Sequence, residues 1–260
     1  MFRWKRKSED PLLKSLLEKY QLNLLSIPRE GARIGELYIQ DPNSKSLTSP
    51  GMITNFLVPK FKITEITPNE IMAHVTGTVS SQKSGNIGLD MLEGFLRSFG
   101  LANMGPSVKA VYEASNKNGI VFSFEDPKRD SVDPIEFGAK IVKHKFMENN
   151  ALYAEDRRYF VTTAIAKSSS ITIEVIGDEK SSMEIDAKVT SIVEAKGGVS
   201  VEKSKTGRIT FKGDRSLVFG VELYELVYDK DKDGFKMYVS DEARTMKGPE
   251  AALIETPEDT

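Results

Sequence analysis

The chain has 260 residues, enough for one large β-rich domain or two small ones, and its 39% apolar content is ordinary for a globular protein. With 36 Lys and Arg against 38 Asp and Glu, the net charge is −2, which argues against a uniformly basic nucleic-acid-binding protein. The absence of Cys excludes disulfides, cysteine zinc sites, iron–sulfur clusters and a thiol nucleophile, and two His are too few for a multi-histidine metal centre.

The first residues combine aromatic and basic side chains. Phe2 and Trp4 stand among four Lys and Arg within the first seven positions. This combination suits an anionic membrane interface, although a solvated terminus would have the same composition. A charged stretch follows where a signal peptide needs an apolar core, and no apolar run reaches the roughly 18 residues of a transmembrane helix. We therefore expect a protein that is made and kept in the cytoplasm.

Two segments have the apolar spacing of amphipathic helices. The leucines from Leu12 to Tyr20 predict a first helix, and Leu89–Phe99 predicts a second one, preceded by turns at Gly85 and Gly88. Residues 134–147 contain apolar residues and lysines in a pattern that fits either a short helix or an exposed strand.

Other segments have the residue types or the alternation of β-strands. They are residues 23–27, 34–39, 70–79, 108–114, 120–124, 160–166, 171–175, 183–190, 209–211, 217–223 (after Lys212-Gly213) and 235–239. In 70–79 the alternation places Ile71, Ala73 and Val75 on one side. Asn116–Gly119 predicts the turn of a hairpin over 108–124. A loop is expected at 42–50, and the serines at 168–170 are interpreted as a flexible connector between two strands.

The C-terminal segment is acidic. Residues 241–260 contain six acids and two bases, a net charge of −4, so residues 1–240 carry −2 − (−4) = +2. Such a segment can act as an intramolecular mask or as a solubilising end. The apolar run Ala251–Ile254 favours docking. We therefore predict one domain over residues 1–240 with a short C-terminal tail over 241–260, and an α+β fold in which amphipathic helices pack on a twisted, mostly antiparallel sheet.

No motif predicts catalysis or a cofactor. Asp229–Gly234 matches the first half of a calcium loop, but the twelfth position is Ser240 and a strand precedes it, so a hairpin turn is favoured. The serines at 168–170 lack the glycine-flanked elbow of a nucleophile. His74 is expected to be a structural histidine within a strand, and His144 is expected on a solvated face. An enzyme is the least favoured class, and no cofactor or metal is expected.

Two short basic clusters contain aromatic residues. They comprise Lys140, Lys143 and Lys145, followed by Arg157 and Arg158. Nucleic acid is a weak interpretation because the total charge is negative. The clusters fit equally well as contacts to anionic lipid headgroups, each worth on the order of 1 kcal/mol.

The order of these elements resembles the gasdermin family of pore-forming proteins, most closely its short bacterial members. Tyr159–Ala164 is similar to the strand that opens the family's second membrane-inserting region, and Arg208–Leu226 is similar to the apolar strand pattern that follows. The predicted helices resemble the family's first helix and the helix between its first pair of inserting strands. The resemblance spans most of residues 10–240.

The resemblance implies a latent monomer that oligomerises into a membrane pore and causes cell death as a bacterial defence. Strands cross a bilayer only in a closed barrel, and each crossing needs about 9–11 alternating residues. Residues 183–193 and the strands within 108–124 meet that length. Since one chain cannot close such a barrel, many copies would assemble at the inner membrane. A soluble β-rich lipid- or protein-binding module that never inserts remains the alternative, because half-buried soluble strands alternate in the same way.

The family's short members also imply a C-terminal peptide that a protease removes. We expect cleavage within residues 241–248, after Arg244 or Lys247, and docking of the tail through Leu253 and Ile254. Several relatives carry an acylated Cys near the N-terminus, which this sequence lacks, so Phe2 and Trp4 are the candidates for anchoring in its place.

Overall fold

The computed structural model describes most of the chain. The described residues are 11–42, 47–63, 65–79, 82–101, 107, 110, 120–147, 154, 156–175, 187, 189, 191, 199–203, 208–229, 234–240 and 245–246. The helices are α1 (Pro11–Tyr20), α2 (Gln82–Ser98) and α4 (Pro134–Ile141), with a 3-10 turn at Ile53–Asn55. The strands are β1 (Asn23–Arg29), β2 (Glu36–Gln40), β3 (Thr48–Met52), β4 (Leu57–Val58), β5 (Thr67–Ile71), β6 (Val75–Val79), β7 (Ile120–Phe124), β8 (Lys128–Ser131), β9 (Lys145–Phe146), β10 (Arg158–Val175), β11 (Ser200–Lys203), β12 (Arg208–Asp229), β13 (Gly234–Val239) and β14 (Thr245–Met246).

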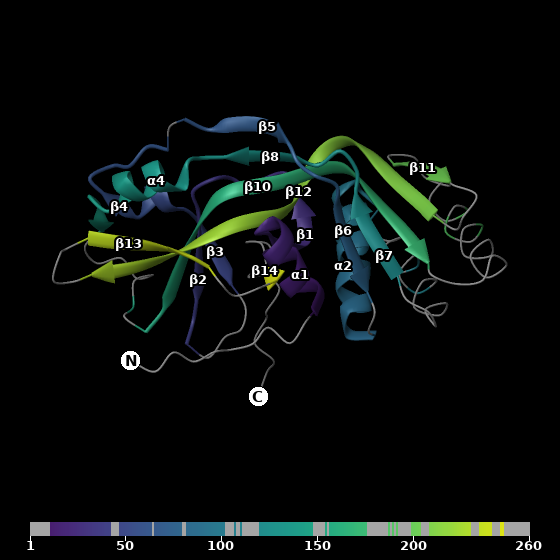
Figure 1. Cartoon of the computed structure of the whole chain (residues 1–260), viewed down its shortest axis with the longest axis horizontal. Coiled ribbons are helices and arrows are strands. Elements are labelled where there is room, and N and C mark those ends of the chain that lie inside the picture. The colour runs from purple at the N-terminus through teal and green to yellow at the C-terminus, as the bar shows by residue number, and fades with distance from the viewer. Residues whose placement is uncertain are drawn as a thin grey trace.

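Two long antiparallel strands form the spine of the fold. β10 has 18 residues and β12 has 22, and they pair from Tyr159 opposite Leu226 to Glu174 opposite Arg208. Along its other edge β10 pairs with β2, β8 and β7, while β12 pairs with β13, β1 and β11. Within the described residues this gives one twelve-stranded, twisted sheet that spans the molecule (Figure 1). The predicted α+β fold with a mostly antiparallel sheet is confirmed.

The sheet carries two hydrophobic cores. The first lies between the sheet and helices α1 and α2, both of which contact β1 and β6. The second surrounds α4, β2 and the left-hand parts of β10 and β12 in Figure 1. Consecutive residues of β1 serve both, since Leu24 belongs to the first core and Leu25 to the second. This division follows from the strand periodicity, which sends neighbouring side chains to opposite faces.

Both predicted amphipathic helices are confirmed, but α2 is longer than expected. α1 ends at Tyr20 as predicted, whereas α2 already begins at Gln82, so the predicted turns at Gly85 and Gly88 are wrong. Glycine disfavours a helix by only about 1 kcal/mol per residue. Burial of one face of α2 outweighs that cost, because Met91, Leu92, Phe95 and Leu96 are each almost fully buried.

The ambiguous segment 134–147 contains both a helix and a strand. The side chain of Asp133 accepts hydrogen bonds from the backbone N–H groups of Ile135 and Glu136, and Pro134 occupies the first helical position. These are favourable features at a helix N-terminus. After α4 ends, the two residues of β9 pair with β4.

The serine segment is not a connector, which corrects that prediction. β10 runs without interruption from Arg158 to Val175, and Ser168 and Ser170 are buried within it. The Ser168 hydroxyl donates to the carbonyl of Glu125 at 2.8 Å and accepts from the N–H of Ser170 at 3.1 Å. Small hydroxyl side chains that satisfy their polar groups in this way are compatible with a buried strand.

Several local strand predictions are also wrong. Residues 70–79 form two strands, with Ile71 94% exposed and Ala73 and His74 exposed between them, so His74 is not a buried structural histidine. Within the predicted loop 42–50, residues 48–50 instead belong to β3, which has β2 as its described neighbour.

The strands predicted at 183–190 and 108–114 are contradicted where the structure describes them. Ala187, Val189 and Ser191 are helical, as is Ala110. The apolar residues at 185, 189, 192 and 193 also fit the helical period, so the alternation did not discriminate. The rest of these segments and the turn Asn116–Gly119 lie outside the described residues. β7 is confirmed, although its described partners are β6 and β10.

Candidate functional site

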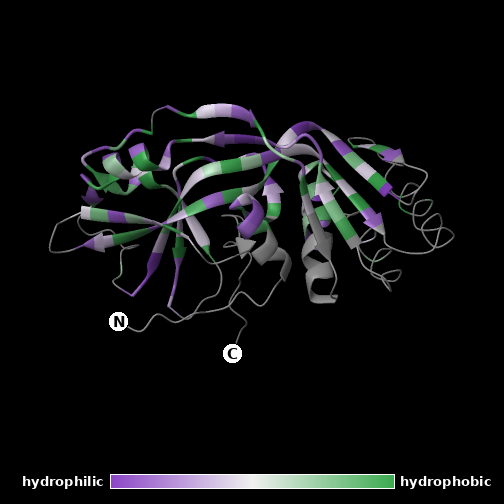
Figure 2. Ribbon diagram, in the orientation of Figure 1, coloured by the Kyte–Doolittle hydropathy of each residue, from purple (hydrophilic) through white to green (hydrophobic). Residues whose placement is uncertain are grey.

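β7 and the parts of β10 and β12 that pair near it, around Ile173 and Ile209, present an apolar face and a polar face. Apolar side chains on these strands are buried beneath α1 and α2: Phe122, Phe124, Ile171, Ile173, Ile209 and Phe211. In Figure 2, green and pale residues alternate along these strands at the right of the molecule. The aromatic ring of Phe124 also stacks on that of Phe219, with centroids 3.7 Å apart and planes within 5° of parallel.

The opposite face carries a hydroxyl and ion-pair network. The hydroxyls of Thr172 and Thr210 lie 2.8 Å apart, and Thr172 donates to Glu125 at 2.9 Å. Arg208 pairs with the same Glu125 oxygen at 2.6 Å. Because Glu125 lies just after β7, Thr172 on β10 and Arg208 on β12, this network ties three strands together.

Two further ion pairs join β8 to the spine. Lys167 Nζ lies 2.6 Å from Asp130 Oδ2, and Arg129 Nη2 lies 2.6 Å from Glu222 Oε2. All four side chains are at least partly buried, so their charges are less screened than those of exposed pairs. The strands are therefore amphipathic, with apolar residues under the helices and paired polar residues opposite.

Part of the predicted tail forms an edge strand. β14 pairs in parallel with β1, with Thr245 opposite Leu24 and Met246 opposite Leu25. The two candidate cleavage residues, Arg244 and Lys247, directly flank β14 and lie outside the described residues, as do Leu253 and Ile254. Figure 1 shows β14 beside α1 and β1. Sequence analysis did not predict this strand, because two residues carry no periodic pattern.

The structure brings together the segments that carry the two basic clusters. The rings of Phe146, the residue after Lys145, and Tyr159, the residue after Arg158, lie 5.2 Å apart. Lys143 and Lys145 are exposed. Lys140 pairs with Glu136, Arg157 with Asp41 at 2.7 Å, and Arg158 with both oxygens of Glu225 at 2.7 Å. Phe2 and Trp4 lie outside the described residues.

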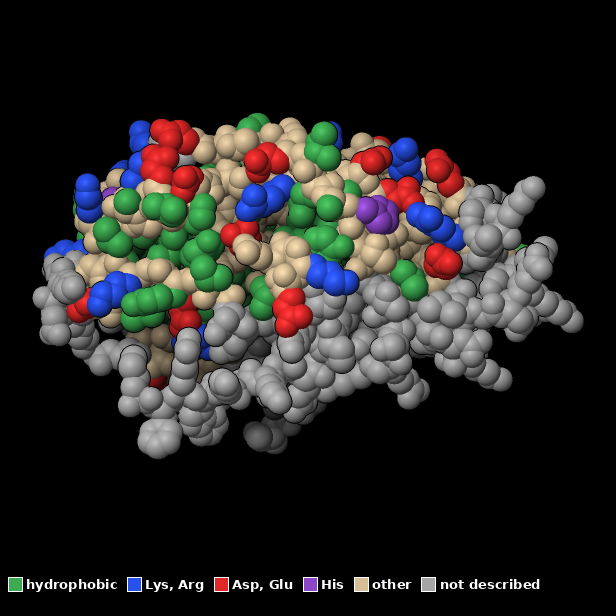
Figure 3. Space-filling model, in the orientation of Figure 1, with side chains coloured by type: hydrophobic (Ala, Val, Ile, Leu, Met, Phe, Trp, Pro, Cys, Tyr) green, Lys and Arg blue, Asp and Glu red, His purple; other side chains and the backbone are tan. Residues whose placement is uncertain are grey.

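Acidic and basic side chains are mixed on the face seen in Figure 3.

His144 packs its ring 5.1 Å from that of Phe61, and its Nδ1 lies 3.0 Å from the carbonyl of Lys140. It is partly covered rather than placed on a solvated face, which corrects that prediction. The ring contact and the neighbouring carbonyl explain this position.

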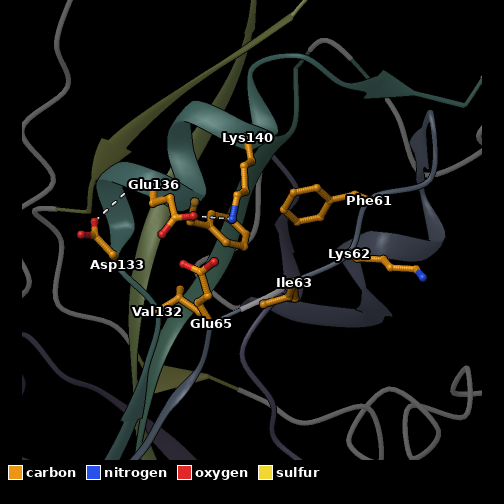
Figure 4. A pocket seen from close by; sticks show the side chains of 9 residues that line it. Phe61, Lys62, Ile63, Glu65, Val132, Asp133, Glu136 and Lys140 are labelled. Carbon is orange, nitrogen blue, oxygen red and sulfur yellow. Dashed lines mark hydrogen bonds and ion pairs between the residues drawn. The ribbon is translucent and has the colours of Figure 1, made fainter.

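A small pocket lies beside α4, lined by Phe61, Ile63, Glu65, Glu136 and Lys140, among others. Figure 4 shows the ammonium of Lys140 directed at the carboxylate of Glu136, with Glu65 nearby. The hydrogen bond from Lys140 lowers the pKa of Glu136, and the same contact raises the pKa of Lys140. Both groups are therefore held in their charged forms, which is not the arrangement of a general acid or base near neutral pH.

Sequence analysis missed one buried polar cluster, which joins β1, β2 and β3. Glu36 Oε1 accepts hydrogen bonds from Arg29 at 2.5 Å and from the Ser49 hydroxyl at 2.7 Å, and Arg29 also donates to the Tyr38 hydroxyl at 3.2 Å. Burial raises the pKa of Tyr38, and the negative charge of Glu36 adds to that rise. These residues come from three strands, so no local spacing could reveal their contact.

The described residues contain no group of three or more potential metal-ligating acids or histidines. Among the same residues, no helix combines the length and hydropathy that a membrane crossing requires.

The fold and the amphipathic strands define a class: an α+β protein whose helices cover the apolar face of a long antiparallel sheet. Its sequence matches the Bacterial Gasdermin Family over residues 25–235. The chain belongs to the bacterial gasdermin family. The match confirms the predicted resemblance and supports a pore-forming role in general. Gasdermins are pore-forming effectors rather than enzymes.

Relatives and a solved structure agree with this assignment. The gasdermin bGSDM of a Vitiosangium species is 25% identical over 223 residues, covering 84% of this chain and 81% of the relative. That of Bradyrhizobium tropiciagri is 26% identical over 243 residues, covering 88% and 85%. The structure of a bacterial gasdermin from Bradyrhizobium tropiciagri matches with a TM-score of 0.60 and 18% identity, covering 91% of this chain and 95% of that one. This structural likeness concerns the fold.

Proposed function

We propose that this chain is a latent pore-forming protein. In its latent state it is a cytoplasmic monomer. After a protease removes a segment of the tail at residues 241–260, many copies assemble in the inner membrane into a large β-barrel pore. The pore kills the cell and thereby limits the spread of phage. No cofactor, metal or nucleic acid takes part.

The observation that carries this proposal is the two-faced character of β7, β10 and β12. In a membrane barrel, one face of each strand meets lipid and the other meets water. The face formed by residues such as Ile173 and Phe211 is apolar, and the face that carries Thr172 and Thr210 is polar. β10 has 18 residues, more than the roughly 9–11 that a crossing needs, and the alternation described above lies in its part around Ile171–Ile173.

The helices explain why such a chain remains soluble in its latent state. α1 and α2 cover the apolar face and bury it in the first core. Exposing apolar area to water costs about 25 cal/mol per Å², so in water the strands are more stable within this core than outside it. A bilayer offers the same face an alternative apolar environment once α1 and α2 are released.

The tail supplies the restraint that proteolysis removes. β14 adds a strand to β1, whose Leu24 belongs to the core beneath α1 and α2. Cleavage after Arg244 or Lys247 also raises the net charge of the body by 3 or 4, respectively, which favours approach to anionic lipid. Phe2 and Trp4 are candidate membrane contacts, together with the cations Lys140, Lys143, Lys145, Arg157 and Arg158. Lys140, Arg157 and Arg158 would exchange their carboxylate partners for lipid phosphates.

Dye release from vesicles tests the proposal. Residues 1–244 and the full chain are added at equal concentration to dye-loaded vesicles of phosphatidylcholine with phosphatidylglycerol, and to vesicles of phosphatidylcholine alone. The truncated chain is expected to release dye, faster from anionic vesicles, and to migrate as a large oligomer after detergent extraction. The full chain is expected to leave both kinds of vesicle sealed. If the truncated chain stays monomeric and releases no dye, the pore function is wrong and the binding module is favoured.

A further inference from the structure

The C-terminus of α2 lies against the largest irregularity in β12. Ser170 pairs with Lys212 and Ser168 pairs with Leu217, so two steps along β10 correspond to five along β12. The additional residues of β12, at 213–216, therefore leave the regular ladder. Such bulges bend a strand and redirect its side chains.

Arg215 in this bulge caps the end of α2. The N–H of Leu101 donates to the carbonyl of Leu96 and that of Gly100 to the carbonyl of Arg97, each at 3.0 Å, with Gly100 at a φ of +81°. This pattern closes the helix but does not use the carbonyl of Ser98. Arg215 Nη2 donates to that carbonyl at 2.8 Å. A cation at this end also interacts favourably with the helix dipole.

The same arginine connects α2 to two other elements. Its guanidinium carbon lies 5.5 Å from the centroid of the Phe99 ring, and its Nε lies 2.6 Å from Glu30, the residue directly after β1. The backbone of β12 approaches Phe99 so closely that a Cβ at Gly213 would overlap its ring. The position therefore requires glycine while Phe99 stays in place.

The last turn of α2 is also fitted to the end of β1. The Ser98 hydroxyl donates to the carbonyl of Pro28 at 2.7 Å, and a Cβ at Gly94 would lie 3.0 Å from Pro28 Cδ. These contacts hold α2 at the edge of the core that covers the apolar face of the sheet. β14 pairs near the start of β1, opposite Leu24 and Leu25, whereas α2 contacts the end of β1 at Pro28.

We propose that Arg215, Phe99, Gly213 and Glu30, together called the α2 clasp, form a second restraint that is separate from the tail. The clasp keeps α2 on the sheet and sets the rate at which the apolar face becomes available after cleavage. This inference rests on the proposed pore function. The tail determines whether conversion begins, and the clasp determines how quickly α2 leaves.

Two variants open the clasp from opposite sides. Arg215→Gln removes the charge and the guanidinium contacts, and Gly213→Ala displaces the ring of Phe99. Two matched controls make similar changes elsewhere. Lys236→Gln removes an exposed cation that pairs with Asp229 at 2.7 Å. Gly220→Ala adds a methyl group in the same strand, where its nearest neighbours would lie at an ordinary 3.5 Å.

Two measurements are made on all four variants and on the unmodified sequence. The first is the initial rate of dye release by residues 1–244 from anionic vesicles. The second is the rate of backbone hydrogen exchange in α2 of the full chain without lipid. Since Arg215 and Glu30 are about half exposed, with side-chain exposures of 49% and 52%, a modest effect is expected: both rates rise about threefold to tenfold in the clasp variants only.

The two measurements separate the clasp from the pore. If unmodified residues 1–244 release dye and the clasp variants match their controls or are slower, the clasp is wrong and the pore proposal stands. If unmodified residues 1–244 release no dye, the pore proposal fails, and so does the role of the clasp in setting the rate of conversion. Exchange then decides its role on α2: faster exchange in the clasp variants supports the restraint, and unchanged exchange overturns it. If Gly213→Ala fails to fold, the exposed substitution Arg215→Gln carries the test.

Discussion

The two candidate cleavage positions differ in one structural respect, which allows the role of β14 to be isolated. A cut after Arg244 removes β14, whereas a cut after Lys247 leaves β14 attached to the body. The charges removed are nearly equal: residues 245–260 hold four acids and one base, a net of −3, and residues 248–260 hold four acids, a net of −4. The bodies that remain carry −2 + 3 = +1 and −2 + 4 = +2.

These differences predict opposite orders of activity. If charge release alone activates the protein, residues 1–247 are more active, because they have the more positive body. If β14 restrains the sheet, residues 1–244 are more active. The two residue pairs between β14 and β1 supply on the order of two backbone hydrogen bonds, worth about 1 kcal/mol each, or about 2 kcal/mol in total. That corresponds to roughly a thirtyfold shift between the restrained and released states.

The assay is the initial rate of dye release from anionic vesicles at equal protein concentration, with the full chain as the inactive reference. We expect residues 1–244 to release dye at least about tenfold faster than residues 1–247. Equal rates, or faster release by residues 1–247, would refute a restraining role for β14 and leave charge as the explanation of activation.

Three further outcomes follow from the described contacts. Lys143→Gln combined with Lys145→Gln in residues 1–244 is expected to weaken binding to anionic vesicles by about thirtyfold, because each lysine contributes about 1 kcal/mol. The control Lys236→Gln is expected to leave binding unchanged in the same vesicle-sedimentation assay. Equal binding by all forms would exclude these contacts. Glu36→Ala leaves the charge of Arg29, whose side chain is 19% exposed, without its carboxylate partner. This variant is expected to lower the free energy of unfolding by about 3 kcal/mol in urea denaturation, whereas Glu36→Leu with Arg29→Met recovers most of the loss. A loss below about 1 kcal/mol would contradict the argument. Because burial raises the pKa of Tyr38, the unfolded chain loses this proton first, so stability should decline as pH rises above about 10, and less steeply for Tyr38→Phe; identical slopes would show that Tyr38 does not contribute.

Features encoded by neighbouring residues were predictable from the sequence. The leucine spacing of α1 and the buried face of α2 at Met91–Leu96 have a helical period, and both helices form as expected. The hairpin between β12 and β13 was predicted from turn-forming residues, and Asp229 pairs with Gly234 at its end. Turn and helix chemistry acts over a few positions, which is the range that a single sequence displays.

Features decided by distant partners were not predictable in the same way. Ser168 and Ser170 have the composition of a linker, but contacts with Glu125 and burial between strands keep them within β10. Residues around Val189 fit both the strand and the helical period, so burial against the first core decides the outcome. The hydrogen bond from Arg215 to the carbonyl of Ser98 joins residues 117 positions apart, and nothing in the local sequence of either indicates the other.

The shared element in both proposed restraints is β1. Its Leu24 and Leu25 pair with β14, its Pro28 accepts the hydrogen bond from Ser98 of α2, and Glu30 just beyond it pairs with Arg215. Its edge toward β12 is held by register pairs such as Asn23 with Val221. A strand held in this way on both edges transmits the loss of either neighbour to the same helix–sheet boundary. Removal of β14 therefore frees one edge of β1 while the α2 clasp still holds α2, so cleavage should yield a short-lived form in which the tail is gone but α2 still covers the sheet. In this form, backbone hydrogen exchange in α2 should be faster than in the full chain and slower than in the same cleaved chain with Arg215→Gln.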